Sequence, residues 1–314
     1  MLDRIVITGG AGFIGANLAR HLVDTGTAAS VVAYDNLSTG FADNVANLSG
    51  VDLVEGDILD QDHLTEVLAG TDAVVHLAAR PSVPKSIEDP IASHDNNATG
   101  TIRVLEAMRA AGVNRIVAAS SSSVYGANPV LPKVETLQPM PVSPYAVSKL
   151  ATESYVLSYQ QVFGFSGVAF RFFNVFGPLQ RAGHAYAAVV PAFVSAALAG
   201  EPLSVHGDGG QTRDFTFVGS VAAVISDVLA KGSSSNQPVN LAFGTRYSLL
   251  ELIDHLEEIL GHPLERDHVQ PRPGDVRDSQ ADQQRVRSLV PSLEPVDLDT
   301  GLRETIAWFR SLEA

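Results

Sequence analysis

The sequence predicts an α/β protein with a doubly wound parallel sheet, joined to a smaller carboxyl-terminal α/β domain. Short runs rich in Val and Ile alternate with helical patterns through the first half of the 314 residues. Such runs are typical of parallel strands buried on both faces. A glycine-rich turn follows the first run, and the alternation becomes irregular after Asn174. Repeated strand–helix–strand units form a sheet with helices on both faces.

The first half supplies the predicted strands and helices of this sheet. We expect strands at residues 4–8, 30–34, 51–55, 73–77, 115–119 and 167–172. We expect helices at residues 13–24, 62–68, 95–110 and 145–163. The crossovers between successive parallel strands should be right-handed.

The second half is less regular. Helices are expected at residues 192–198, 218–229, 248–260 and 301–312, and strands at 203–205 and 239–242. We divide the chain into a first domain of residues 1–174, to which residues 215–245 return. The second domain then comprises residues 175–214 and 246–314 and is expected to bind the substrate.

Composition excludes several classes of function. A formal net charge of −14 opposes binding to nucleic acid or to an anionic membrane surface. With no cysteine, disulfides, thiolate metal sites and thiol catalysis are excluded, and no metal site is predicted. The chain begins almost at once with a strand and contains no run of about 18 apolar residues. We therefore expect a soluble, cytoplasmic protein.

The first functional motif is the glycine turn after the first strand. Gly9, Gly12 and Gly15 allow a tight turn, close approach of a pyrophosphate, and close packing of helix on strand. The helix that follows offers free N–H groups to phosphate. Asp35 ends the second strand, where a carboxylate accepts hydrogen bonds from ribose hydroxyls and repels a 2′-phosphate. Asn36 follows without an adjacent arginine, so NAD is favoured over NADP.

The next two strands end in residues that suit the same crevice. Asp57 follows the third strand and would accept a hydrogen bond from an adenine amino group, although an Asp that begins a helix would look the same. His76 ends the fourth strand and precedes small residues that let a cofactor approach the backbone. We interpret His76 itself as a structural histidine whose hydrogen bonds are satisfied.

A candidate general base lies at the start of a predicted helix. Tyr145 and Lys149 are four residues apart, so they share one helix face. A free tyrosine has a pKa near ~10, and a neighbouring cation lowers it. The serine run of residues 120–123 follows the fifth strand and faces the crevice, where a hydroxyl would relay a proton to Tyr145. An isolated Tyr-x-x-x-Lys pattern is weak, and its meaning depends on the other motifs.

The chain closely resembles a known family over essentially its whole length. The resemblance rests on GGAGFIG, DNLSTG, GDI, HLAA, SSSSVYG, SPYAVSK, RFFNVFGP, GDGGQTRDFTFV and PRPGDVR, in this order. These motifs are typical of the extended short-chain dehydrogenase/reductases, and the chain is most similar to their UDP-glucose 4-epimerase group. The resemblance implies a Rossmann domain that holds NAD tightly and a UDP-sugar bound between the domains.

The resemblance also assigns roles to residues. Tyr145 matches the catalytic base, Lys149 its partner on the nicotinamide ribose, and Ser121 the catalytic Ser/Thr. The expected cofactor-binding residues are Gly9, Gly12, Phe13, Ile14, Gly15, Asp35, Asn36, Ser38, Thr39, Gly40, Asp57, Ile58, Leu77, Ala78, Ala79, Asn96, Ser120, Tyr145, Lys149 and Phe172. The expected substrate-binding residues are Ser82, Ser121, Ser122, Ser123, Tyr145, Asn174, Ala188, Val189, Val205, His206, Arg213, Arg272, Asp275 and Ser279.

The implied reaction is 4-epimerisation of a UDP-hexose. Ser122 and Ser123 stand where sugar-nucleotide dehydratases carry Asp and Glu, and serines replace that acid and base poorly. Ser279 lies where the group controls access of a C2 N-acetyl group, and its small size implies activity on UDP-Glc/UDP-Gal and on UDP-GlcNAc/UDP-GalNAc. UDP-glucuronate is the alternative substrate if Arg80 or Lys85 lies near the sugar.

Two other classes of function stay open from the sequence alone. One is another NAD-dependent oxidoreductase of nucleotide sugars that releases its reduced cofactor, and the other is a non-enzymatic NAD-binding module. The presence of Ser121, Tyr145 and Lys149 together opposes the second class. The resemblance further implies a homodimer formed through the helices at residues 95–110 and 145–163.

Overall fold

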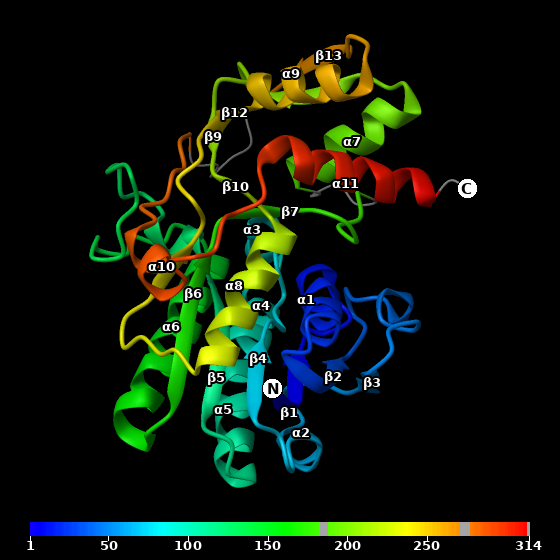
Figure 1. Ribbon diagram of the computed structural model, residues 1–314. Coiled ribbons are helices and arrows are strands. Elements are labelled where there is room, and N and C mark those ends of the chain that lie inside the picture. Colours follow the sequence, from blue (N-terminus) through cyan, green and yellow to red (C-terminus); the bar gives the residue numbers. More distant parts are fainter. Residues whose placement is uncertain (183–187, 271–276, 313–314) are drawn as a thin grey trace.

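A computed structural model describes residues 1–182, 188–270 and 277–312 (Figure 1). Its centre is a parallel sheet of seven strands in the order β11-β6-β5-β4-β1-β2-β3. The strands are β1 Leu2–Thr8, β2 Ala28–Asp35, β3 Val51–Glu55, β4 Ala73–His76, β5 Arg115–Ser121, β6 Ser166–Phe172 and β11 Val239–Leu241. The predicted doubly wound parallel sheet is confirmed.

Helices cover both faces of the sheet. One face carries α1 (Phe13–Asp24), α8 (Val218–Lys231) and α10 (Gln284–Leu289), and the other carries α2 (Gln61–Val67), α5 (Gly100–Ala111) and α6 (Pro144–Phe163). Each face forms an apolar core with its helices. In β1, Ile5 and Ile7 pack into the first core, against α1 and α8, whereas Val6 packs into the second core, against α2, α5 and α6. Because both faces are buried, the strands show continuous apolar runs instead of alternation.

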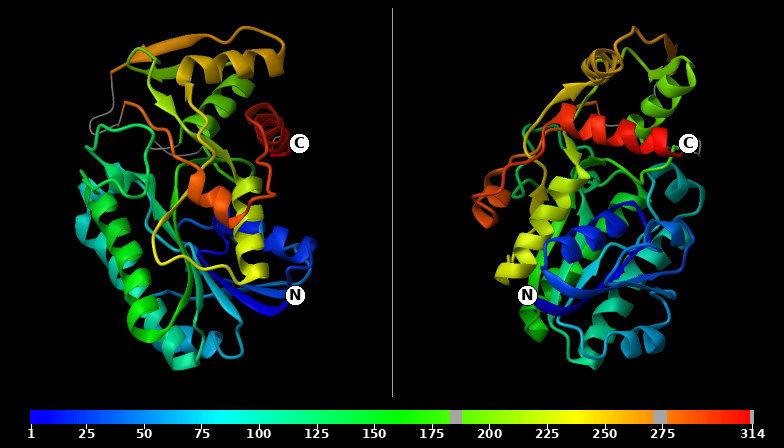
Figure 2. Two further views of the ribbon diagram at one scale, coloured as in Figure 1. Left: turned by 60° about the vertical axis from the view of Figure 1, so that its left-hand side comes forward. Right: turned by 45° about the vertical axis from the view of Figure 1, so that its right-hand side comes forward.

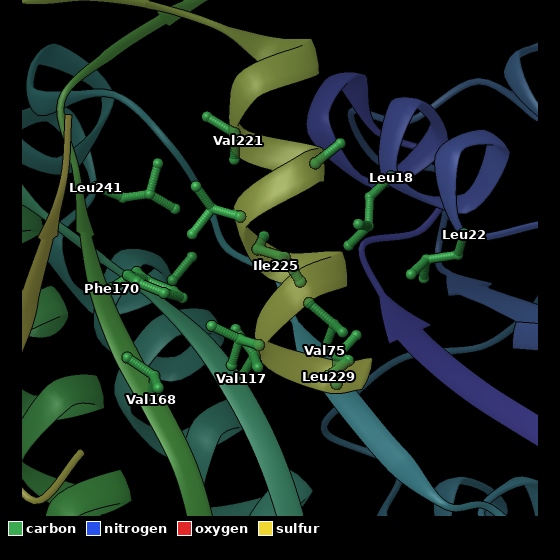
Figure 3. Packing of buried hydrophobic residues seen from close by; sticks show 14 of the residues in the cluster. Leu18, Leu22, Val75, Val117, Val168, Phe170, Val221, Ile225, Leu229 and Leu241 are labelled. Carbon is green, nitrogen blue, oxygen red and sulfur yellow. The ribbon is translucent and has the colours of Figure 1, made fainter. Parts of the chain in front are cut away.

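Figure 3 shows the first of these cores from close by. Ile225 and its neighbours on α8 lie between Leu18 and Leu22 of α1 and the side chains of the sheet, such as Phe170. The segment around α8 and β11 comes late in the sequence, yet β11 extends the sheet beside β6. The division into two domains stays a prediction.

A second group of elements lies beyond the carboxyl ends of the strands (Figures 1 and 2). It contains α7 (Val189–Ala199), α9 (Leu249–Leu260) and α11 (Leu298–Ser311) around one apolar cluster. The same group contains short strands: β7 Asn174–Phe176, β8 Leu203–His206, β9 Thr212–Arg213, β10 Phe215–Phe217, β12 Tyr247–Ser248 and β13 Arg266–Val269. Most of these strands have two or three residues, too few for a period to be seen in the sequence.

The segment between β4 and α5 differs from its prediction. Residues 95–99 form a π-helical turn before α5, and two short helices, α3 (Val83–Glu88) and α4 (Pro90–His94), precede it. The prolines of this segment stand in the first turns of α3 and α4, where a missing N–H costs nothing. Ser82 and Asp89 cap the two helices by accepting hydrogen bonds from backbone N–H groups.

Helix α6 is fixed to the sheet by a buried ion pair. Arg171 of β6 donates to both carboxylate oxygens of Glu153, at 2.6 and 2.8 Å, and both side chains are almost fully buried. The Ser120 hydroxyl, on the neighbouring strand β5, donates to the same carboxylate at 3.0 Å. The guanidinium also lies over the ring of Tyr125, at 4.7 Å from its centroid. Both charges are therefore fully partnered in the interior.

Within the described residues, no helix is long and apolar enough to cross a membrane.

Removal of one partner of the buried Arg171–Glu153 ion pair should strongly destabilise the protein. Arg171→Leu leaves the Glu153 carboxylate buried without a cation and should lower the free energy of unfolding by about 3–5 kcal/mol. The double variant with Glu153→Leu removes both charges and should recover most of that loss. Urea unfolding measures each value. Arg266→Leu, which breaks more exposed ion pairs to Asp254 and Glu257, should cost only about 0–1 kcal/mol. A double variant as unstable as Arg171→Leu would contradict this account.

Candidate active site

The first cavity, of about 340 Å³, lies at the carboxyl ends of the strands. Eighteen of the twenty predicted cofactor residues line it: Gly9, Gly12, Phe13, Ile14, Gly15, Asp35, Asn36, Ser38, Thr39, Ile58, Leu77, Ala78, Ala79, Asn96, Ser120, Tyr145, Lys149 and Phe172. Gly40 and Asp57 are not among its lining residues. Gly40 leaves room beside the Asp35 carboxylate, and the Asp57 carboxylate accepts a hydrogen bond from Asn36 at 2.9 Å.

Further lining residues were not predicted. They are Tyr34, Gly56, Pro81, Ala119, Phe173, Val175 and Gln180. Ser121, which was predicted as a catalytic and substrate residue, also lines this cavity. Gly56 and Ala119 were within reach of prediction, since each adjoins a predicted strand end. Gln180 belongs to an irregular segment with no sequence signal.

The glycine turn has the shape that a dinucleotide requires. Gly9 has φ +74°, and a Cβ there would lie 2.7 Å from the backbone nitrogen of Ala78. A Cβ at Gly15 would overlap the carbonyl oxygen of Gly9. The N-cap residue of α1, Gly12, makes no side-chain cap, so the first N–H groups of the helix remain available for a phosphate.

Asp35, the last residue of β2, lines this cavity. Its carboxylate accepts hydrogen bonds from the backbone nitrogens of Ala11 at 3.0 Å and Leu37 at 2.9 Å. Burial raises the pKa of Asp35, while these backbone hydrogen bonds oppose the shift. The carboxylate is thus held rigidly at the place where the sequence predicted contact with ribose.

Ser121, Tyr145 and Lys149 all line the same cavity. Helix α6 begins at Pro144, and its N-cap, Ser143, accepts a hydrogen bond from the N–H of Ala146. One turn on, the Lys149 ammonium donates to the Ala119 carbonyl at 2.9 Å, and burial lowers the pKa of Lys149 to about 8. The end of β5 therefore sets the direction of the Lys149 side chain.

The electrostatics of Tyr145 differ from the prediction. Burial raises the pKa of Tyr145, whereas the sequence suggested that the cation of Lys149 would lower it. A hydrogen bond with the Ser121 side chain opposes the rise. The reason is that a phenolate loses hydration in the interior, and the Lys149 ammonium addresses the backbone of β5. Without a further positive charge in the cavity, Tyr145 is a neutral phenol.

His76 has the structural role that we assigned to it. It is fully buried beneath the cavity, with Nδ1 2.8 Å from the Thr8 hydroxyl and Nε2 3.1 Å from the Thr101 hydroxyl. Burial lowers the pKa of His76 to about 3, so the ring is neutral at pH 7.

A second cavity, of about 580 Å³, adjoins the first and extends between α7, β8 and β9. Four residues line both cavities: Tyr145, Phe173, Val175 and Gln180. The predicted substrate residues that line the second cavity are Ser82, Tyr145, Asn174, Ala188, Val189, His206 and Arg213. Arg213 is oriented by donating to the carbonyls of Thr212 at 2.8 Å and Arg277 at 3.1 Å.

Other predicted substrate residues lie elsewhere. Val205 is buried in the core, and its neighbours on β8, Ser204 and His206, line the cavity instead because side chains alternate along a strand. Ser122, Ser123 and Ser279 are not lining residues of the second cavity. Ser123 donates to the Ser121 hydroxyl at 2.9 Å, and the N–H of Ser279 donates to the Thr212 carbonyl at 3.1 Å. The predicted residues Arg272 and Asp275 lie outside the described residues.

Residues 5–242 match the NAD dependent epimerase/dehydratase family. The chain belongs to this family. A UDP-glucose 4-epimerase from Mycolicibacterium smegmatis is 38% identical over 315 residues, which cover 98% of this chain and 99% of the relative. The resemblance to the extended short-chain dehydrogenase/reductases is thereby confirmed.

Two solved structures are similar over nearly all of the chain. UDP-N-acetylglucosamine 4-epimerase from Methanobrevibacter ruminantium, in complex with UDP-N-acetylmuramic acid, has a TM-score of 0.92 at 36% identity, with 99% of this chain and 100% of that chain covered. UDP-glucose 4-epimerase from Thermotoga maritima, with UDP-glucose, has a TM-score of 0.92 at 32% identity, with 99% and 100% covered.

The cofactor of this epimerase/dehydratase family is NAD, as predicted, and the first cavity fits it. The glycine cradle leaves no room for side chains where a pyrophosphate must approach, and α1 offers unpaired N–H groups there. Asp35, the residue predicted to contact ribose, and Lys149, the residue predicted to contact the nicotinamide ribose, both line this cavity. In the parts of the chain that the structure describes, no group of three or more His, Asp and Glu could hold a metal ion.

The hydrogen bond between Ser121 and Tyr145 can be tested by titration. Ser121→Ala removes the interaction that lowers the Tyr145 pKa, so ionisation of the phenol should move to higher pH. The measurement is the ultraviolet absorbance of tyrosinate against pH, with Tyr145→Phe as the reference that isolates the signal. Ser122→Ala, which removes a neighbouring hydroxyl, serves as the control and should leave the titration in place. An unchanged titration in Ser121→Ala would show that the bond does not tune the phenol.

Proposed function

We propose that the protein is a UDP-hexose 4-epimerase that interconverts UDP-Glc and UDP-Gal and also UDP-GlcNAc and UDP-GalNAc. The observation that carries this proposal is the position of Tyr145, which lines both the dinucleotide cavity and the adjoining cavity. A base in a wall shared by both cavities can contact a hydroxyl of the substrate while the carbon that bears it faces the cofactor. This is the arrangement that proton removal coupled to hydride transfer requires.

The reaction divides into steps that the residues support. The UDP moiety binds in the second cavity, where Arg213 offers a planar cation to phosphate oxygens, and the sugar extends toward Tyr145. Tyr145, as phenolate, takes the proton of the 4-hydroxyl, with Ser121 hydrogen-bonded to it. NAD, when bound, supplies positive charge beside the phenol, accepts the hydride from C4 and returns it. Once the 4-keto sugar has turned its opposite face toward the cofactor site, Tyr145 gives the proton back to the C4 oxygen.

The serine run favours epimerisation over dehydration, which the same family name also covers. Elimination of water needs an acid and a base next to the catalytic serine. At those positions this chain has Ser122 and Ser123, and the Ser123 hydroxyl is bonded to Ser121. A hydroxyl does not ionise near neutral pH, so it cannot replace a carboxyl in either role.

Placement of the nearby cations supports a neutral hexose. Arg80 and Lys85, the two residues that could favour a glucuronate, are not lining residues of either described cavity. Arg80 is paired with Asp89 at 3.4 Å, and Lys85 lies in the short helix α3. The backbone N–H of Ser279 donates to the Thr212 carbonyl, next to Arg213, but Ser279 lines neither described cavity, so its proposed effect on an N-acetyl group rests on the family resemblance and on its small size.

Tyr145→Phe tests the assignment of the base. Loss of the ionisable oxygen should lower kcat by about 10²- to 10⁴-fold, the usual contribution of a general base. Steady-state turnover of UDP-Gal measures it. Tyr155→Phe, ten residues further along the same helix, is the matched control and should retain activity. Turnover by Tyr145→Phe close to that of the unmodified protein would remove Tyr145 from the reaction.

A panel of UDP-sugars at equal concentration tests the substrate. NMR of the products should show inversion at C4 for both the glucose and the N-acetylglucosamine series, and little or none for UDP-glucuronate. Ser279→Tyr should selectively reduce turnover of the acetylated pair, because a bulky side chain would occupy the space of the N-acetyl group. Turnover of UDP-glucuronate alone would replace the proposed substrate, and no turnover of the acetylated pair would refute the role of Ser279.

We further propose a homodimer through α5 and α6. On α6, Val147, Tyr155 and Val162 expose apolar surface at spacings of eight and seven residues, which place them on one helix face. Ile91, on α4 beside α6, is 72% exposed. A second copy would cover this stripe with its own α5 and α6.

Light scattering coupled to size exclusion tests this interface. The mass should be about twice the 33.2 kDa of one chain. Val147→Glu places a charge in the stripe and should give a monomer, because a buried unpaired carboxylate is costly. Val296→Glu, at an exposed valine whose N–H donates to Ser220 of α8 on the other face of the sheet, should remain a dimer. A monomeric unmodified protein would contradict the proposal.

A further inference from the structure

Two chain segments that form walls of the dinucleotide cavity also contact each other through residues that do not line the cavity. Thr39, in the loop after β2, and Gln180, in the segment after β7, both line the cavity. Close to each along the chain, Phe41 and Arg181 are in contact, with the guanidinium carbon of Arg181 3.7 Å from the centroid of the Phe41 ring. The loop after β2 continues a strand of the central sheet, whereas the segment after β7 leads toward α7 of the second group of elements (Figure 1). The contact therefore bridges the cavity.

Further contacts hold the same segment. The Asn17 side chain donates to the carbonyls of Phe13 at 2.8 Å and Pro178 at 2.9 Å, so α1 is tied to the segment. Leu179 packs beside the cluster that also receives Leu37. Residues 177–182, which we call the strap, are thus held at three places, Pro178, Leu179 and Arg181, to the sheet-bearing part of the molecule.

The backbone of the strap is strained where it meets this part. Leu179 has φ +70° and Leu37 has φ +56°, both in the left-handed region that non-glycine residues rarely adopt. Such conformations persist where the surrounding contacts over-determine them, and they cluster at ligand clamps. Both leucines hold them beside one apolar cluster, which is consistent with a clamp over a ligand.

We propose that Arg181 and Phe41 form a clasp that retains NAD in its cavity between turnovers. Both are positioning residues that act through the strap and the loop after β2, not through contact with the reacting atoms. The clasp rests on the proposed function in one respect. A 4-epimerase must return the hydride from the same cofactor molecule, and an enzyme that lost its reduced cofactor during turnover would be left without its hydride.

The expected effect is moderate and measurable. A cation–π contact between two surface residues should change the rate of cofactor release by roughly 2- to 5-fold when it is removed. Arg181 and Phe41 make the same contact, so the effects of their substitutions on the rate of NAD release should not be additive. Both residues are at the surface, so their replacement should leave the fold intact.

Release of NAD is measured directly on the purified protein loaded with NAD. Protein is separated from free cofactor, and NAD remaining per chain is followed in time by chromatography of the denatured sample. Arg181→Ala, Phe41→Leu and the double variant should all lose NAD faster than the unmodified protein, and by similar factors. Arg181→Lys and Phe41→Tyr keep a cation over a ring and should restore much of the retention. Arg109→Ala is the matched control, because it removes a similar contact over Phe163, at 4.3 Å, in the last turn of α5.

Three results would overturn the clasp. They are release rates equal to that of the unmodified protein, an equal acceleration by Arg109→Ala, or effects of Arg181→Ala and Phe41→Leu that multiply in the double variant. The measurement does not require turnover of a UDP-sugar. Unchanged release in an active epimerase would refute the clasp alone, and faster release in a protein inactive on UDP-sugars would refute the proposed function alone.

Discussion

The site depends on the buried ion pair between Arg171 and Glu153, because it fixes α6 to the carboxyl ends of β5 and β6. The same carboxylate holds the Ser120 hydroxyl, next to Ser121. One turn before Glu153, Lys149 bonds the carbonyl of Ala119. Residues on two strands and one helix are thereby held in register, which side-chain packing alone would do with less directional precision. Since each charge is fully partnered, the pair adds no unbalanced charge beside the base.

Burial has opposite effects on the pKa values of the two ionisable residues on α6. It raises the pKa of Tyr145 and lowers that of Lys149 to about 8, because in both cases the charged form loses hydration. The protein alone therefore favours a neutral phenol, and the phenolate is favoured only while a positive charge lies in the adjoining cavity. A base that ionises only beside oxidised cofactor removes a proton only when hydride transfer can follow. In the proposed reaction, the same burial that opposes ionisation of Tyr145 would thus link this base to the oxidation state of the cofactor.

The parts of the site that could be predicted from the sequence are those with a fixed spacing. The glycine turn, Asp35 and the Tyr145–Lys149 pair each depend on local geometry, and the structure brings them into one cavity. Residues set by long-range contacts gave no signal. Gln180 lines both cavities, and Arg181 lies over Phe41, in an irregular segment whose position depends on α1 and the loop after β2. The direction of the Tyr145 pKa shift also could not be predicted, since spacing on a helix does not reveal how deeply the phenol is buried.

Cofactor and substrate make opposite demands on walls that they share. In the proposed reaction one must stay through many turnovers, and the other must enter and leave in each. The structure separates the two demands by where each wall is anchored. The wall on the NAD side is attached to the sheet-bearing part of the molecule by two contacts. Arg181 lies over the ring of Phe41, and the Asn17 side chain donates a hydrogen bond to the Pro178 carbonyl. The substrate side is formed by α7, β8 and β9, none of which takes part in those contacts. In the proposed reaction, substrate would therefore exchange past α7 while the strap stays in place, and among the strap residues that the structure describes only Gln180 lines both cavities.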